Sequence, residues 1–228
     1  MKILQILTDT NIGGAGIWLL NFLKSYNRDK LDVSVVLPKG AKLVKQIENL
    51  NINVIEAENI ADKSFSFSGI KTFKKIITDE KPDIIHTHAC ISARIAGRIK
   101  GVKIINTRHC LEEKKSFPKN ILYRFINNIL SDGVIGVSEA VVNNLIYDGI
   151  KKNKVHLVYN GINPLVPITC EEKIQIRKKY GFDENNVIIG IVARLEEVKN
   201  HDLFLKAAKL SYEKDPNLRF LIVGTGSL

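Results

Sequence analysis

Cysteines are few in this chain and lie far apart. Cys90, Cys110 and Cys170 are the three cysteines in 228 residues, and no two of them form a C-x-x-C pair. Neither a zinc site nor a disulfide framework is therefore indicated, and reduced, mostly buried thiols are expected. A nucleophilic pair of Cys110 with His109 is disfavoured, because adjacent residues on a strand point to opposite faces.

Long hydrophobic runs are also absent. No apolar stretch approaches the roughly 20 residues that are needed to span a bilayer. The N-terminus has one lysine and a very short apolar run, followed by Asp9 and no small-residue cleavage site. Residues 2–7 are therefore predicted to form a first strand and not a signal peptide, and a cytoplasmic location is expected.

Acidic residues are outnumbered: 34 Lys and Arg face 24 Asp and Glu, which gives a net charge of +10. The lysines are scattered, and aromatic residues do not alternate with them as in base-stacking surfaces, so a nucleic-acid partner is disfavoured. Attraction to an anionic membrane surface is one remaining interpretation, and general lysine richness without a partner is the other.

One segment favours the membrane interpretation. Lys114, Lys115, Lys119 and Arg124 surround an amphipathic helical pattern at 118–130 that also carries aromatic residues. A basic helix with aromatic anchors can lie on an anionic membrane. The protein would then be a peripheral protein at the inner face of the membrane. A solvated face over a core-packed apolar stripe is the alternative.

Apolar runs alternate with helical patterns along the first 160 residues, which predicts βαβ units and a parallel sheet. The predicted strands are 2–7, 33–37, 52–55, 83–86, 103–106, 133–137 and 155–158. The predicted helices are 15–26, 40–49, 69–80, 90–99, 118–130 and 139–147. The fold class is therefore α/β, with a doubly wound, mostly parallel, Rossmann-like domain at 1–162.

The pattern then restarts. Residues 163–186 are predicted to be a linker and a connecting helix that ends at Gly181. A new β-α-β unit follows, with strands at 187–193 and 218–223 and a helix at 201–214. Because two strands and one helix make a poor independent core, residues 187–228 are expected to be the truncated start of a second Rossmann-like domain.

Two cations follow the first strand of this second unit. Arg194 directly ends the apolar run, and Lys199 comes shortly after it. In open α/β sheets the carboxyl ends of the strands are where ligands bind. Two fixed positive charges there suit a diphosphate, especially one that gains charge as it leaves.

A glycine-rich loop follows the first strand and opens a helix. Gly13 and Gly14 would let the backbone approach a ligand, and the helix N-terminus favours an anion. The loop is not G-x-G-x-x-G, and the second strand closes Leu37-Pro38-Lys39-Gly40, without an acid for a nicotinamide cofactor's ribose. A dehydrogenase is therefore disfavoured, and a tight turn without a ligand is the alternative.

Histidines end two predicted strands. His86 and His88 share one face, but the sequence offers no third ligand, so a pocket-lining or structural His88 is favoured over a metal site. His109, at the end of the next strand, can hydrogen-bond a bound sugar or acceptor, or cap a buried carbonyl. The sequence leaves both roles open.

Two further segments lie at the end of the first domain. Ser138, followed by Glu139, is a natural helix N-cap, which is favoured over a binding role. Asn160 and Gly161 predict a turn that would set the geometry of a hinge between the domains.

Together these residues resemble the retaining glycosyltransferases of family 4, which have the GT-B architecture. The resemblance covers nearly the whole chain and is carried by the order and spacing of its motifs. These are Gly13-Gly14, Pro82-Asp83-Ile84-Ile85-His86-Thr87-His88, His109, Val137-Ser138-Glu139, Asn160-Gly161-Ile162, Gly190-Ile191-Val192-Ala193-Arg194-Leu195 with Lys199, and Leu221-Ile222-Val223-Gly224-Thr225-Gly226.

The resemblance implies a hexosyl-type transferase whose C-terminal domain holds a nucleotide-sugar donor and whose N-terminal domain holds a glycan or lipid-linked acceptor. Arg194 and Lys199 would bind the donor diphosphate and stabilise it as leaving group, and His109 would contact the transferred sugar. The implied donor-binding glycines are Gly13, Gly14 and Gly224, and the implied acceptor-side or pocket-lining residues are His88, Ser138, Glu139 and Asn160. No metal or other cofactor is expected, and cell-surface polysaccharide or glycolipid synthesis is the implied setting.

The family also has two glutamates, seven residues apart, in a part of the C-terminal domain that would lie beyond Leu228. This chain alone is therefore expected to show no sugar transfer. The alternatives are a GT-B-like nucleotide-sugar epimerase and a non-catalytic half-enzyme that needs a partner chain.

Overall fold

The computed structural model describes residues 1–112 and 119–227. The chain divides into two compact units, Met1–Asn163 and Pro164–Leu228. The first unit holds a seven-stranded sheet and the second a two-stranded sheet, each described below from its own contacts.

The sheet of the first unit is parallel throughout. Its strands are β1 (Lys2–Ile6), β2 (Asp32–Pro38), β3 (Asn53–Ala57), β4 (Ile84–Thr87), β5 (Lys103–Arg108), β6 (Gly133–Gly136) and β7 (Val155–Leu157). Their order across the sheet is β3-β2-β1-β4-β5-β6-β7, and every neighbouring pair is parallel. The α/β, doubly wound fold that the alternating pattern predicts is therefore confirmed.

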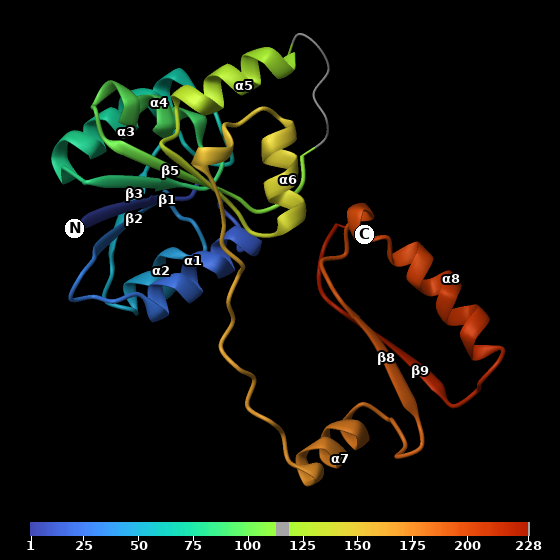
Figure 1. The fold of residues 1–228 in the computed structure, drawn as a ribbon. Coiled ribbons are helices and arrows are strands. Elements are labelled where there is room, and N and C mark those ends of the chain that lie inside the picture. Colours follow the sequence, from blue (N-terminus) through green and yellow to red (C-terminus); the bar gives the residue numbers. More distant parts are fainter. Residues whose placement is uncertain (113–118, 228) are drawn as a thin grey trace. The chain divides into compact units, whose positions relative to one another are not determined.

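Helices cover both faces of this sheet (Figure 1). They are α1 (Gly14–Ser25), α2 (Val44–Glu48), α3 (Phe67–Glu80), α4 (Ile91–Ile99), α5 (Lys119–Ile129) and α6 (Glu139–Tyr147). Successive residues of β1 point to opposite faces, so Leu4 and Ile6 join the core beneath α3 and α4. On the other face, Leu7 follows the strand into the core formed with α1 and α2.

The second unit contains α7 (Cys170–Lys179), β8 (Val187–Val192), α8 (His201–Tyr212) and β9 (Leu218–Val223). The two strands pair in parallel, so the predicted β-α-β unit is present. Thr169 opens α7 with a reciprocal capping box to Glu172, and Gly181 follows the helix with a φ of 72° in the left-handed region.

Three local predictions are wrong. The helix expected at 40–49 is only Val44–Glu48, because Gly40 has a φ of 73° and holds a turn. Cys90 is buried, but Cys110 and Cys170 are exposed, since one follows the end of a strand and the other opens a helix that buries no residue. Asn160-Gly161 forms no turn, because residues 158–169 run without regular structure.

The segment 118–130 forms α5, although Lys114 and Lys115 lie outside the described residues. Tyr123 is half-buried and donates a hydrogen bond to Glu112, so this aromatic side chain faces the protein. Ile121, Phe125 and Ile129 are exposed, so the helix has apolar side chains on its outer side as well. Within the described part of the chain, every helix is too short or too polar to cross a bilayer.

Candidate functional site at the carboxyl edge of the sheets

The strand order reverses beside β1. The chain builds β2 and β3 outward on one side of β1 and then returns to place β4 on the other side. Ligands of open α/β sheets bind at such a switch point, beyond the carboxyl ends of the strands. The loop with Gly13 and Gly14 follows β1, His88 follows β4 and His109 follows β5, so all three segments lie at this edge.

The structure brings three histidines together at the switch point. His88 Nδ1 lies 2.8 Å from His109 Nε2, and His88 Nε2 lies 3.4 Å from Gln5 Oε1 on β1. His86 Nε2 lies 2.7 Å from Thr107 Oγ1. The spacing of His86 and His88 predicted a shared face, and their ring centroids are indeed 4.8 Å apart.

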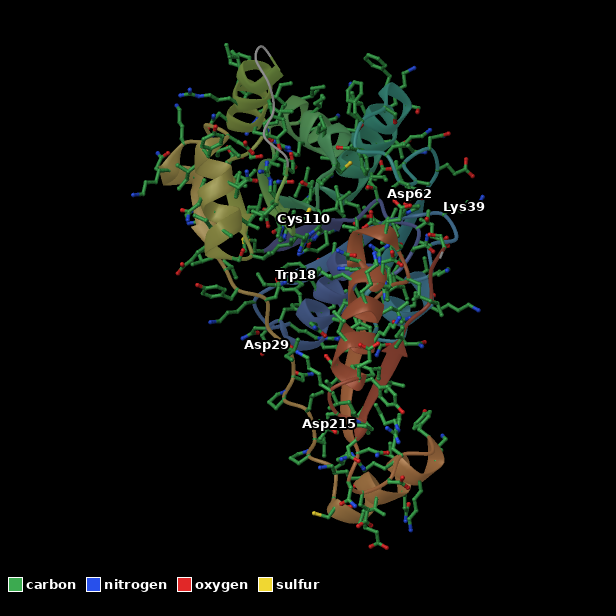
Figure 2. All side chains as sticks on the ribbon, turned by 90° about the vertical axis from the view of Figure 1, so that its right-hand side faces the viewer. Trp18, Asp29, Lys39, Asp62, Cys110 and Asp215 are labelled. Carbon is green, nitrogen blue, oxygen red and sulfur yellow. The ribbon has the colours of Figure 1, made fainter. Side chains whose placement is uncertain are left out.

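Trp18 on α1 covers this histidine cluster. Its ring centroid lies 5.5 Å from that of His86, 5.0 Å from that of His88 and 5.8 Å from that of His109. Figure 2 labels Trp18 and also Cys110, which follows the third histidine. Sequence reasoning missed Trp18 and Gln5, although the only tryptophan near a glycine loop and a lone polar residue inside an apolar strand were available signals.

Burial keeps these histidines neutral. It is the main cause that lowers the pKa of His86 to about 4, with a smaller contribution from His109. Burial, and then the neighbouring His86 and His109, hold the pKa of His88 well below its usual value. Burial also lowers the pKa of His109. At neutral pH each ring therefore carries one proton and no charge.

A cavity of about 400 Å³ adjoins the cluster. Its lining includes Asp9, Ala15, Ala89, Arg94, His109 and Cys110. Cys110 and His109 both line it, because β5 ends at Arg108 and strand alternation does not extend to them. Ala89 has a φ of 67°, and such a conformation in a residue other than glycine stores strain at the cavity wall.

Charged groups of both signs surround this cavity. Arg94 is buried and donates to Asn127 Oδ1 at 2.7 Å, whereas the buried Arg108 forms an ion pair with Asp148 at 2.8 Å. Burial, and then Asp62, raise the pKa of Asp9. Such mixed donors and acceptors suit a neutral, hydroxyl-rich ligand, and sequence reasoning singled out neither arginine.

The N-terminus of α1 lacks a side-chain cap. Gly13 occupies the cap position, no acidic residue lies in the first turn, and Ala15 of this turn lines the cavity. A Cβ added at Gly13 or Gly14 would meet nothing within 4 Å, so there is open space beside these backbone amides. Helix N-termini of this kind can bind an anionic group.

The two predicted cations share the loop between β8 and α8. Arg194 Nη1 lies 2.6 Å from Glu196 Oε1, in an exposed ion pair. Lys199 ends a short 3₁₀ turn, Glu197–Lys199, and its backbone N–H donates to Glu196 O at 2.9 Å. Asn200 then caps α8 by accepting a hydrogen bond from Leu203 N.

The glycines after β9 pack against this loop. A Cβ on Gly224 would lie 1.9 Å from Ala193 O, and one on Gly226 would lie 2.0 Å from Leu195 O. Only glycine permits so close an approach of two backbones. Gly224 therefore supports the segment that carries Arg194, a role that is consistent with its position after the strand.

The other predicted residues lie away from the cavity lining. Ser138 Oγ accepts a hydrogen bond from Val141 N as the N-cap of α6. Glu139 accepts one from the Tyr159 hydroxyl at 3.2 Å, and Asn160 is exposed. In the described ranges 1–112 and 119–227, no group of three or more His, Cys, Asp or Glu is placed to hold a metal ion.

The doubly wound sheet, followed by a second β-α-β unit with its own carboxyl-edge loop, defines a fold of the GT-B type. The solved structure of HepE from Anabaena, in complex with UDP and glucose, has this fold with a TM-score of 0.81 and 22% identity. Residues 12–164 match Glycosyltransferase Family 4, and residues 172–228 match the Glycosyl transferases group 1 domain. The chain belongs to glycosyltransferase family 4.

Two curated relatives, with different activities in their names, are also similar to this chain in sequence. The chain is 30% identical over 172 residues, 69% of its length, to EpsD of Bacillus subtilis, whose name describes a glycosyltransferase. It is 28% identical over 93 residues, 39% of its length and 25% of the relative's, to a UDP-N-acetylglucosamine 2-epimerase of Methanocaldococcus jannaschii. The match to HepE covers 100% of this chain, but the chain spans only 62% of HepE and 45% of EpsD.

Proposed function

We propose that the protein transfers a hexosyl group, with retention, from a nucleotide-sugar donor to a glycan or lipid-linked acceptor. The observation that carries the proposal is the pair of cations, Arg194 and Lys199, on the loop after β8 of a family 4 chain. The structural relative HepE was crystallised with UDP and glucose, which supports a uridine diphosphate donor. Cell-surface polysaccharide or glycolipid synthesis is the setting we propose.

In this proposal the second unit binds the donor diphosphate. Arg194 supplies a guanidinium fork and Lys199 an ammonium group, and both interactions strengthen as negative charge grows on the leaving diphosphate. Arg194 is already paired with Glu196, but exposed ion pairs contribute only about 0–1 kcal/mol. A diphosphate can therefore replace Glu196 at little cost. The two cations would neutralise the leaving group without a metal ion.

The first unit contributes the acceptor site and the sugar contact. The cavity beside His88 and His109 is lined by positively and negatively charged side chains that can donate and accept hydrogen bonds. Such a lining suits an acceptor hydroxyl. The open amides after Gly13 and Gly14 are suited to an anionic part of the donor. His109 is the residue that would contact the transferred sugar.

The test is an assay of UDP release by the full-length protein from a panel of UDP-sugars, with lipid-linked and glycan acceptors. Replacing Arg194 and Lys199 with Gln removes charge-assisted hydrogen bonds of about 1.5–3 kcal/mol each, so turnover should fall by at least tenfold. Lys209→Gln, which removes an exposed cation from α8 of the same unit, is the matched control and should keep full turnover. Equal and measurable UDP release by the double variant and the control would overturn the proposal, and so would a full-length protein that releases no UDP with any donor and acceptor of the panel.

A nucleotide-sugar epimerase is the second candidate. It is favoured by the 28% identity, over 93 residues of this chain, to the UDP-N-acetylglucosamine 2-epimerase of Methanocaldococcus jannaschii. The solved epimerase of Neisseria meningitidis, bound to UDP-GlcNAc, has a lower TM-score of 0.62 at 18% identity. The same assay distinguishes the two candidates. An epimerase would convert the donor sugar into its isomer without net transfer to an acceptor.

A further inference from the structure

The histidine cluster contains a continuous polar chain across the switch point. It runs from Gln5 on β1, through His88 after β4, to His109 after β5. Gln5 is 1% exposed and His88 is 5% exposed, so water has little access to the chain. Protons on its nitrogens are therefore fixed by the protein groups themselves.

The order of donors and acceptors along the chain follows from Gln5. Its Oε1 faces His88 Nε2 at 3.4 Å. A carboxamide oxygen can only accept, so with the amide in this orientation His88 Nε2 carries the proton. Because His88 is neutral, its Nδ1 then has only a lone pair. That lone pair can accept only from a protonated Nε2 of His109, which lies 2.8 Å away.

This order of protons also determines which nitrogen of His109 is free to bind a ligand in the cavity. His109 is neutral as well, so a proton on Nε2 leaves its Nδ1 as a bare acceptor. None of the described residues forms a hydrogen bond with this Nδ1. His109 lines the cavity, and Trp18 packs on the ring, so its orientation is fixed by packing on one side and by His88 on the other.

We propose that Gln5 and His88 are positioning residues that hold His109 in the Nε2–H form, so that its Nδ1 accepts a hydrogen bond from a ligand hydroxyl. The ligand class rests on the proposed function, because a sugar hydroxyl is the donor that such an acceptor would bind. A neutral ring with an exposed lone pair does not attract a phosphate. His109 therefore selects for a hydroxyl, and the cations of the second unit bind the phosphates.

The first test needs neither donor nor activity. Nitrogen-15 NMR of histidine-labelled protein distinguishes a protonated ring nitrogen from a bare one, and the chain has only five histidines. His88 and His109 should both be Nε2–H forms. A His109 that carries its proton on Nδ1 in the unmodified protein would overturn the proposal.

Variants of the two positioning residues sharpen the test. Gln5→Leu keeps the volume but removes the acceptor, so the Nδ1–H form of His109 should appear. His88→Asn places an amide oxygen near the position of the imidazole Nδ1 and should preserve the Nε2–H form of His109, whereas His88→Leu should not. Unchanged His109 signals in folded Gln5→Leu and His88→Leu proteins would contradict the assignment.

A kinetic test separates this inference from the proposed function. With a UDP-hexose donor, His88→Leu should lower turnover about tenfold, the loss expected for one misplaced hydrogen bond of roughly 1–1.5 kcal/mol, and His88→Asn should restore most of it. If the NMR result holds but no UDP-sugar is turned over, the tautomer assignment stands and the proposed function fails. If turnover is normal in His88→Leu, the positioning role fails and the function stands.

Discussion

Two strands of similar apolar sequence have very different surroundings in the two units. All residues of β2 except Asp32 are buried, because helices cover both faces of the sheet. In β8, Val187, Ile189 and Val192 are 55%, 40% and 81% exposed. An apolar run thus predicts a strand in both units, but burial depends on the layers that pack against it. Unit 1 has a complete core, whereas the β8–β9 sheet has apolar surface left uncovered.

The same contrast extends to the polar groups. In unit 1 the clustered His86 and His88 are buried, His109 is half-buried, all three are neutral, and each has a hydrogen-bond partner. In unit 2 the side chain of Arg194 is 63% exposed and its ion pair lies at the surface. Buried neutral groups can be held in one geometry, while exposed charges can change partners. The proposed division of labour, with hydroxyl recognition in unit 1 and diphosphate binding in unit 2, follows this difference.

Matched isoleucine substitutions should produce the largest difference between the units. Ile85→Ala on β4 removes a fully buried side chain and should cost about 2–5 kcal/mol, because it leaves a cavity. Ile189→Ala on β8 should cost only roughly 1 kcal/mol, since 40% of that residue is already exposed. Both losses of stability can be measured by urea unfolding, with hydrogen exchange at the amides of β4 and β8 as the readout for each strand. Equal losses would mean that β8 is as well covered as β4.

Acid should weaken unit 1 through its buried histidines. The unfolded chain protonates His86 near its ordinary pKa of 6.5, but the folded protein does so only at about 4. The stability from this group is therefore complete above pH 6.5 and falls as the pH drops toward 4, by about 3 kcal/mol in all.

Unfolding free energies of the unmodified protein and His86→Gln between pH 7 and pH 4 test this expectation. The variant should show a shallower loss, because Gln does not titrate. His156→Gln, at an exposed histidine of β7, is the control and should keep the original slope. A His86→Gln protein with the same pH dependence as the unmodified one would refute the assignment.

Two glycines of the second sheet should differ in their tolerance of a methyl group. Gly224→Ala would place a Cβ against Ala193 O and should cost roughly 1–3 kcal/mol of local stability, because backbone must shift. A Cβ on Gly190 of β8 would find its nearest atom at 3.6 Å, so Gly190→Ala should be tolerated. Hydrogen exchange in the β8–α8 loop compares the two, and equal protection in both would show that the loop does not depend on Gly224.

Much of the fold was predictable, because apolar runs and helical periodicity are local properties. The predicted strands lie close to the observed β1–β9, and the shared face of His86 and His88 followed from their spacing. The bonds from His88 to His109 and Gln5 were not predictable, because they depend on which strands become neighbours in the sheet. The exposure of Cys110 and the irregular backbone at Asn160 likewise depend on contacts that no local pattern contains.

The central claim, that the second unit binds the donor through its diphosphate, is tested most directly by calorimetric titration with UDP and with uridine. UDP should bind more tightly than uridine. Gln at both Arg194 and Lys199 should weaken UDP binding by at least about tenfold, whereas the Lys209→Gln control should bind UDP as the unmodified protein does. Equal affinity for UDP and uridine, or UDP binding that the double substitution does not change, would contradict it.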